Sequence, residues 1–222
     1  MKITALQYGK TNLRKQMAFK DAAEGETIPI ALIFFLIETE NKKILVDAGC
    51  DTMPRYELSD FYSPVTILEN DGVNREEITH VLMTHGHHDH ADGLRYYKDA
   101  LICMHSDSFE DIQKYITDEF TVKTFDDDEL KITDNVTLKH IGGHTNGSCV
   151  VLVKSPQTTY VICGDECYSK VNIEKQIPTG NTRSVETSTN FVKEYSKPCY
   201  TPLISHDPDM IGKAGFKVIY VS

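Results

Sequence analysis

Short apolar runs alternate along the chain with polar and amphipathic stretches, and this alternation predicts a mixed α and β protein. The turn-forming sequence Thr133-Asp134-Asn135 predicts a hairpin between two of the strands. No internal repeat, low-complexity tract or linker interrupts the pattern, so we expect one domain over residues 1–222. The runs typical of β-strands cover residues 2–8, 31–38, 43–47, 80–84, 100–104, 136–141, 148–154 and 159–164, with shorter ones at 121–125, 130–133, 203–205 and 217–221.

Helices are predicted mainly from their start signals. Ser63 followed by Pro64 is typical of an N-cap and a first helical position. Ser106 predicts the cap of a helix that continues to about residue 115, and Ser184 predicts the cap of one that continues to about residue 195. Residues 168–182 have neither a clear period nor strong apolar content, so they predict a loop or flap.

Composition and charge narrow the class of partner. Of the 222 residues 40% are hydrophobic and 25% charged, which is typical of a soluble globular protein. The net charge of -10 argues against nucleic acid or an anionic membrane as the main partner. The longest apolar run, residues 28–37, is too short to span a membrane, and no basic-then-apolar signal opens the chain. We therefore expect a cytoplasmic protein, monomeric or homodimeric, whose partner is a small-molecule substrate.

The cysteines agree with a reducing compartment. They are scattered, most of them lie in apolar runs, and no CxxC pair occurs. A chain of this length does not need disulfides to support its core, so we expect buried, reduced thiols. The cysteines are Cys50, Cys103, Cys149, Cys163, Cys167 and Cys199.

One segment concentrates metal-binding side chains. His85, His87, Asp89 and His90 lie within six residues, directly after an apolar strand. Side chains alternate along an extended chain, so His85 and His87 can point the same way, and the next turn can bring a carboxylate and a third imidazole close to them. Imidazole and carboxylate together suit zinc, iron or manganese. Four ligands on so short a loop are crowded for one tetrahedral site, which suggests two adjacent metal ions.

Three further segments place ligand types just after apolar runs. They are Gly143-His144, Gly164-Asp165 and Ser205-His206. The ends of strands present such side chains to one crevice of a sheet protein, so we expect these residues to join the first cluster.

The ordered set of an HxHxDH segment, a later Gly-His, a Gly-Asp and a final His resembles the metallo-β-lactamase-fold hydrolases. The upstream sequence Asp47-Ala48-Gly49 resembles the early Asp-x-Gly of that superfamily. The resemblance covers nearly the whole chain. It implies an α+β fold, a four-layer αβ/βα sandwich in which two mixed sheets lie face to face with helices on the outer faces. It also implies a dinuclear metal site along one edge.

The resemblance implies a ligand set for two zinc ions, with iron or manganese as alternatives. The first ion would be held by three imidazoles, those of His85, His87 and His144. The second would be held by Asp89, His90 and His206. Asp165 would bridge the two ions, and Asp47 would fix a liganding imidazole.

Such a site implies a metal-dependent hydrolase that opens an ester or lactone. Two adjacent cations can share a bridging hydroxide that attacks a carbonyl, and Asp89 or Asp165 could pass the proton to the leaving group. Tyr168, three residues after Asp165, resembles the tyrosine with which N-acyl homoserine lactonases bind or polarise a lactone. Residues 8–29 also resemble the loop that those lactonases place before their second strand.

Two alternatives stay open. One is a thioesterase similar to glyoxalase II, although only sixteen residues follow His206 and the helical domain of that family would not fit. The other is a non-hydrolytic di-iron protein. One departure is Ser148, which stands where the lactonases commonly have a second histidine after their Gly-His. We expect this change to leave the metal ligands intact.

Overall fold

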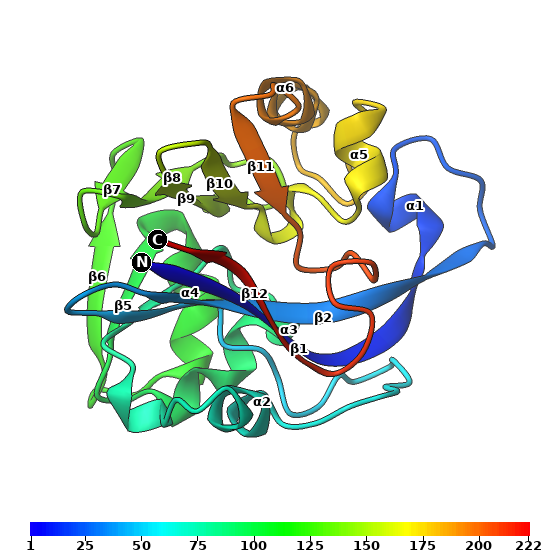
Figure 1. Cartoon of the computed structure of the whole chain (residues 1–222). Coiled ribbons are helices and arrows are strands. Elements are labelled where there is room, and N and C mark those ends of the chain that lie inside the picture. Colours follow the sequence, from blue (N-terminus) through cyan, green and yellow to red (C-terminus); the bar gives the residue numbers. More distant parts are fainter.

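Two mixed β-sheets lie face to face in the computed structural model, which describes all 222 residues (Figure 1). The larger sheet has the order β12-β1-β2-β3-β4-β5-β6, with β1 at Lys2–Arg14, β2 at Thr27–Glu38, β3 at Lys43–Val46, β4 at His80–Leu82, β5 at Leu101–His105, β6 at Thr121–Phe125 and β12 at Gly215–Val221. The smaller sheet has the order β11-β10-β9-β8-β7, with β7 at Glu129–Lys131, β8 at Val136–His140, β9 at Cys149–Lys154, β10 at Thr159–Ile162 and β11 at Tyr200–Leu203.

Helices cover the outer face of each sheet. Figure 1 shows α2, α3 and α4 beside the larger sheet and α5 and α6 beside the smaller one. The predicted four-layer αβ/βα sandwich is therefore confirmed. The helices are α1 at Lys15–Ala18, α2 at Pro64–Asn70, α3 at His88–Ala91, α4 at Phe109–Ile112, α5 at Lys170–Glu174 and α6 at Val185–Tyr195. Single 3₁₀ turns include η3 at Ser106–Ser108, η4 at Gln113–Tyr115 and η5 at Gly164–Glu166.

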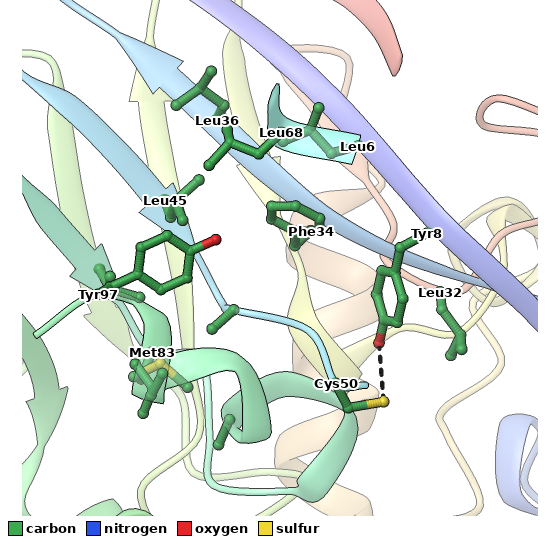
Figure 2. Packing of buried hydrophobic residues seen from close by; sticks show 14 of the residues in the cluster. Leu6, Tyr8, Leu32, Phe34, Leu36, Leu45, Cys50, Leu68, Met83 and Tyr97 are labelled. Carbon is green, nitrogen blue, oxygen red and sulfur yellow. Dashed lines mark hydrogen bonds between the residues drawn. The ribbon is translucent and has the colours of Figure 1, made fainter. Parts of the chain in front are cut away.

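Strand β2 is apolar on both faces because both faces are covered. Phe35 belongs to the core between the two sheets, whereas its neighbour Phe34 belongs to the core between the larger sheet and its helices. Figure 2 shows this second core, where the rings of Phe34 and Tyr8 lie 6.0 Å apart. A third, smaller core joins the other sheet to α6 through Phe191 and Val192.

The N-terminal segment differs from the prediction. The expected loop over residues 8–29 is wrong in part: β1 continues to Arg14, α1 follows directly, and only residues 19–26 form a loop before β2. The extension pairs antiparallel with β2, for example Lys10 with Ala31. A register shift between Gln7 and Gly9 interrupts the alternation of side chains, so the period from which a strand is predicted is lost there.

The helix starts are confirmed in part. Ser184 caps α6 by accepting from the amide of Thr187. Helix α2 begins at Pro64 as predicted, but the hydroxyl of Ser63 donates to Asp51 instead of capping. The predicted helix after Ser106 is broken into η3, α4 and η4, and its first turn is capped by the ring of His105.

The predicted flap over residues 168–182 is wrong in part, because it contains helix α5. Ser169 caps α5 by accepting from the amide of Val171, and Asn172 completes a capping box. A helix this short offers too few residues for a period to be visible in the sequence.

All six cysteines are free thiols, as predicted. Five of them are buried, and Cys199 is exposed. No helix of the protein has the length and apolar content needed to cross a membrane.

We expect Phe34→Ala to lower the free energy of unfolding by about 3–5 kcal/mol, because the ring is 1% exposed and its removal leaves a cavity in the core of Figure 2. Denaturant unfolding measures the change. Tyr62→Ala is the control, since that ring is 52% exposed and its loss should change stability by less than about 0.5 kcal/mol. Equal effects of the two substitutions would contradict the assigned core.

Candidate metal centre

Four of the seven predicted ligands follow the end of a strand. His85 follows β4, His144 follows β8, Asp165 follows β10 and His206 follows β11. His90 and the ligands beside it lie in and before α3, which continues the chain after His85. Both sheets therefore contribute donors to one edge of the sandwich.

The structure brings all seven predicted ligands together in two groups. Within each group the donor atoms lie within 4.8 Å of one another. The first group is His85, His87, His144 and Asp165, and the second is Asp89, His90 and His206. The two groups match the two sets of ligands that the resemblance implied, and Asp165, the predicted bridging residue, falls in the first group.

Asp165 lies between the two groups. Its Oδ1 is 3.0 Å from Nε2 of His90 and 2.9 Å from Nε2 of His206. Its Oδ2 is 3.4 Å from Nε2 of His144 and 3.7 Å from Nε2 of His85. Each carboxylate oxygen thus faces a different group, which is the arrangement that a bridging ligand requires.

Asp47 holds the loop that carries the first ligands. Its Oδ1 accepts from the amide of Thr84 at 2.8 Å, and its Oδ2 accepts from the Thr84 hydroxyl at 2.8 Å. The same Oδ2 is 2.8 Å from Nδ1 of His90, which leaves Nε2 of that ring facing the centre. Asp47 has a φ of 62°, a left-handed conformation that Asp tolerates better than most residues. The predicted role of Asp47 in fixing an imidazole has this geometry.

Backbone carbonyls orient two other imidazoles. Nδ1 of His144 donates to the carbonyl oxygen of Asn181 at 2.6 Å, and Nδ1 of His206 donates to that of Ala31 at 2.9 Å. These bonds fix the tautomers and direct both Nε2 atoms toward the centre. Sequence reasoning did not find Asn181 or Ala31, because a main-chain acceptor leaves no signal in residue identity.

The donor set fits metal ions. Nε2 of His85 is buried without any hydrogen-bond partner. Nε2 of His144 lies 2.9 Å from Nδ1 of His87, and Nε2 of His90 lies 3.4 Å from Nε2 of His206. Imidazole nitrogens that converge on one another are stabilised by a cation that accepts their lone pairs.

Charges around Asp165 favour the ionised form of this ligand. Burial alone would raise its pKa, but the imidazoles of His206 and His90 hold the pKa well below the usual value for Asp. Burial also lowers the pKa of His85 well below the usual value for His. The carboxylate is thus ionised and the His85 ring neutral, which are the states that bind a metal ion.

Tyr168 lies directly beside this cluster. Its hydroxyl donates to Oδ2 of Asp165 at 2.6 Å, and its ring stacks on that of His206 with centroids 5.2 Å apart. Burial, reinforced by Asp165, raises the pKa of the phenol well above the usual value for Tyr. The phenol therefore stays protonated and can act as a hydrogen-bond donor.

Two hollows meet at the cluster. One, of about 320 Å³, has Asp165, Tyr168 and His206 among its lining residues and an apolar wall formed by Leu13, Met17, Ile30, Met53, Pro54 and Tyr56. The other, of about 490 Å³, is lined almost entirely by polar residues, including Lys114, Asn146 and Arg183. His87, His88 and Asn181 line both hollows.

Two face-to-face sheets with a largely buried histidine–aspartate cluster at one edge define a metal-binding protein of the αβ/βα class. The family model described as the metallo-beta-lactamase superfamily matches residues 34–197. The chain therefore belongs to this superfamily, as the HxHxDH segment predicted.

Within this superfamily the chain is similar to several N-acyl homoserine lactonases, both in sequence and in fold. The chain is 25% identical to an N-acyl homoserine lactonase of Bacillus sp, over 87% of each protein. It is 23% identical to the N-acyl homoserine lactonase of Bacillus cereus, over 95% of this chain and 94% of that protein. An N-acyl homoserine lactone hydrolase with N-hexanoyl-L-homoserine bound at its catalytic metal centre shares the fold with a TM-score of 0.80 and 19% identity, over 94% of both chains. The dizinc quorum-quenching lactonase AidC has a TM-score of 0.73 and 17% identity, over 99% of this chain and 94% of its own.

We expect Asp47→Asn to weaken binding of a divalent metal ion by about 10–100-fold while the fold is kept. Asn tolerates the left-handed backbone and can still accept from the Thr84 amide, but its NH₂ group cannot accept from His90. Competition with a chelator measures the affinity, and circular dichroism checks the fold. Unchanged affinity in a folded variant would show that Asp47 does not support the metal ligands.

Proposed function

We propose that this protein is a dinuclear zinc hydrolase that opens the ring of a lactone carrying an apolar acyl chain, with N-acyl homoserine lactones as the first substrates to test. The single observation that carries the proposal is Asp165, whose two oxygens face two separate groups of donors. Membership of the superfamily and the likeness to N-acyl homoserine lactonases support the reaction class.

The proposed ligands are His85, His87 and His144 for one ion and Asp89, His90 and His206 for the other, with Asp165 between them. When bound, a pair of zinc ions supplies Lewis acidity and makes water a nucleophile near neutral pH.

The side chains of this protein supply positioning and proton transfer. Tyr168 lies at the junction of the donors and the apolar hollow, where its hydroxyl can turn from Asp165 to the carbonyl or the leaving oxygen of a lactone. Asp89 lines the same hollow, and its Oδ2 lies 3.8 Å from Nε2 of His90 and 3.7 Å from Nε2 of His206. We assign to Asp89 or Asp165 the transfer of a proton from the attacking water to the ring oxygen. The water oxygen bonds to the acyl carbon, the bond from that carbon to the ring oxygen breaks, and the products are a carboxylic acid and an alcohol.

The apolar wall of this hollow favours a substrate that carries an acyl chain. Leu13 is buried, whereas Met17 and Met53 are half-buried and present flexible side chains to the hollow. A volume of about 320 Å³ is at the lower end of the range for small-molecule sites, which suits a lactone with a chain of moderate length.

The polar hollow favours a second candidate, a thioesterase acting on a thioester with a polar thiol part. Lys114 and Arg183 line this hollow among other polar residues. A polar leaving group could therefore bind on the side of the metal cluster opposite the acyl chain. Lactone and thioester substrates compared on the same zinc-loaded protein separate the two functions.

We expect zinc-loaded protein to release acid when offered an N-acyl homoserine lactone and the chelator-treated protein to release none.

His87→Ala should abolish turnover, because it removes a donor from the first group without touching the core. Tyr168→Phe should cost less, about 10²–10³-fold in kcat, since it removes one hydrogen-bond donor. Titration of the released proton measures turnover in the wild type and in both variants. Full turnover by His87→Ala would refute the mechanism, and silence of the wild type towards lactones would favour the thioester.

We expect kcat/KM to rise with acyl chain length, by a factor of up to about four for each CH₂ that enters the apolar hollow, since burying a CH₂ contributes about 0.8 kcal/mol. Met17→Gln should flatten this dependence because it makes the wall polar at nearly constant volume. Met210→Gln, outside the hollow, is the matched control. A chain-length dependence that survives Met17→Gln unchanged would place the acyl chain elsewhere.

A further inference from the structure

Glu166 is a fully buried carboxylate directly behind the metal cluster. Its side chain is 0% exposed, and its hydrogen-bond partners include no Lys or Arg. It follows Asp165 in the short turn η5, but it points to different partners. A buried carboxylate is costly unless its oxygens are hydrogen-bonded, so its partners indicate what it does.

Those partners all belong to the loop that carries His144. Oε1 accepts from the amide of Gly143 at 3.1 Å and from the amide of His144 at 2.9 Å. It also accepts from the hydroxyl of Ser148, whose oxygen accepts in turn from the amide of Thr145 at 3.2 Å. One oxygen thus fixes both ends of the turn on which His144 lies.

The local sequence allows this close approach. A Cβ atom at Gly143 would collide with Oε2 of Glu166, so a side chain at position 143 would force the carboxylate away from the loop. Oε2 itself is buried without a hydrogen-bond partner. The protein therefore keeps a buried carboxylate of which only one oxygen is hydrogen-bonded. Burying the other oxygen without a partner lowers the stability of the fold, which points to a role other than stabilisation.

The turn η5 connects three parts of the cluster. Gly164 packs so tightly against Thr84, the residue held by Asp47, that a Cβ atom would collide there. Asp165 faces the donors of both groups, and Glu166 holds the loop of His144. Three consecutive residues of one turn therefore make three different contacts. Gly164 contacts the loop that leads to His85, Asp165 contacts the metal donors, and Glu166 contacts the loop that carries His144.

We infer that Glu166 is a positioning residue for His144, acting with Ser148, and that it sets the affinity of the metal ion held by His85, His87 and His144. This inference rests on the proposed function, because it assumes that His144 binds a metal ion. Glu166 belongs to neither group of metal donors and lines neither hollow. It acts by holding the main chain at 143–144 so that Nε2 of His144 faces Asp165.

Stepwise zinc titration of Glu166→Ala tests the inference. We expect one of the two zinc ions to bind about 10–100-fold more weakly, while the ion of Asp89, His90 and His206 keeps its affinity. Glu166→Gln should restore most of the lost affinity, because an amide oxygen can still accept from the two amides of Gly143 and His144. Ser148→Ala should give a smaller loss at the same ion, since it removes only the hydrogen bond from the Ser148 hydroxyl.

The matched control is Asn172→Ala. Asn172 is also fully buried and bonds only to the main chain, donating to Ala18 and Ile177 and accepting from Ser169. It should lower the melting temperature of the metal-free protein without selective loss of one zinc ion.

Selective loss of one ion in Glu166→Ala, with recovery in Glu166→Gln, supports the inference. Equal weakening of both ions, or a Gln variant as weak as the Ala variant, would overturn it. If Glu166→Ala does not fold, the selective loss expected of Ser148→Ala decides in its place, and normal binding of both ions by that variant overturns the inference. A wild-type protein that binds no zinc would instead refute the proposed function.

Discussion

The crowding of ionisable groups at one buried edge is the constraint on which the rest of this structure depends. Within each of the two groups the donor atoms lie within 4.8 Å of one another. Imidazoles and carboxylates so close together are costly to bury unless each has a fixed proton and a fixed partner. The protein meets this demand with acceptors behind the donors: the carboxylate of Asp47 and the carbonyls of Ala31 and Asn181. Each of these acceptors binds the Nδ1 atom of one imidazole, so the lone pair on Nε2 of that ring points toward the centre of the cluster.

The same demand explains why the donors come from both sheets. No single strand end could present so many side chains to one point, because neighbouring side chains on a strand point to opposite faces. Here β4 and α3 present donors from the larger sheet, and β8, β10 and β11 present them from the smaller one. The apolar core between the sheets, to which Phe35 belongs, holds the two sets of donors in place relative to each other.

Much of this arrangement was predictable from the sequence, and the failures have physical causes. The seven donors could be predicted because histidine and aspartate after apolar runs form a dense pattern, and the resemblance supplied their grouping. Strand β1 was predicted too short, since a register shift at Gln7 and Gly9 breaks the period of two. The helix after Ser169 is too short to show a period at all. The carbonyls of Ala31 and Asn181 could not be predicted, because any residue offers a carbonyl and only the fold places it.

The apolar wall of the smaller hollow has a consequence for how such proteins diverge. Leu13, Met17, Met53 and Tyr56 come from the end of β1, from α1 and from the loop after β3, none of which carries a metal donor. Substitutions at these four positions can reshape the cavity without disturbing the histidines and aspartates at the strand ends. Selection can therefore act on the choice of ligand and on the chemistry as two nearly independent traits, so a single catalytic core can persist while lineages exchange one small molecule for another.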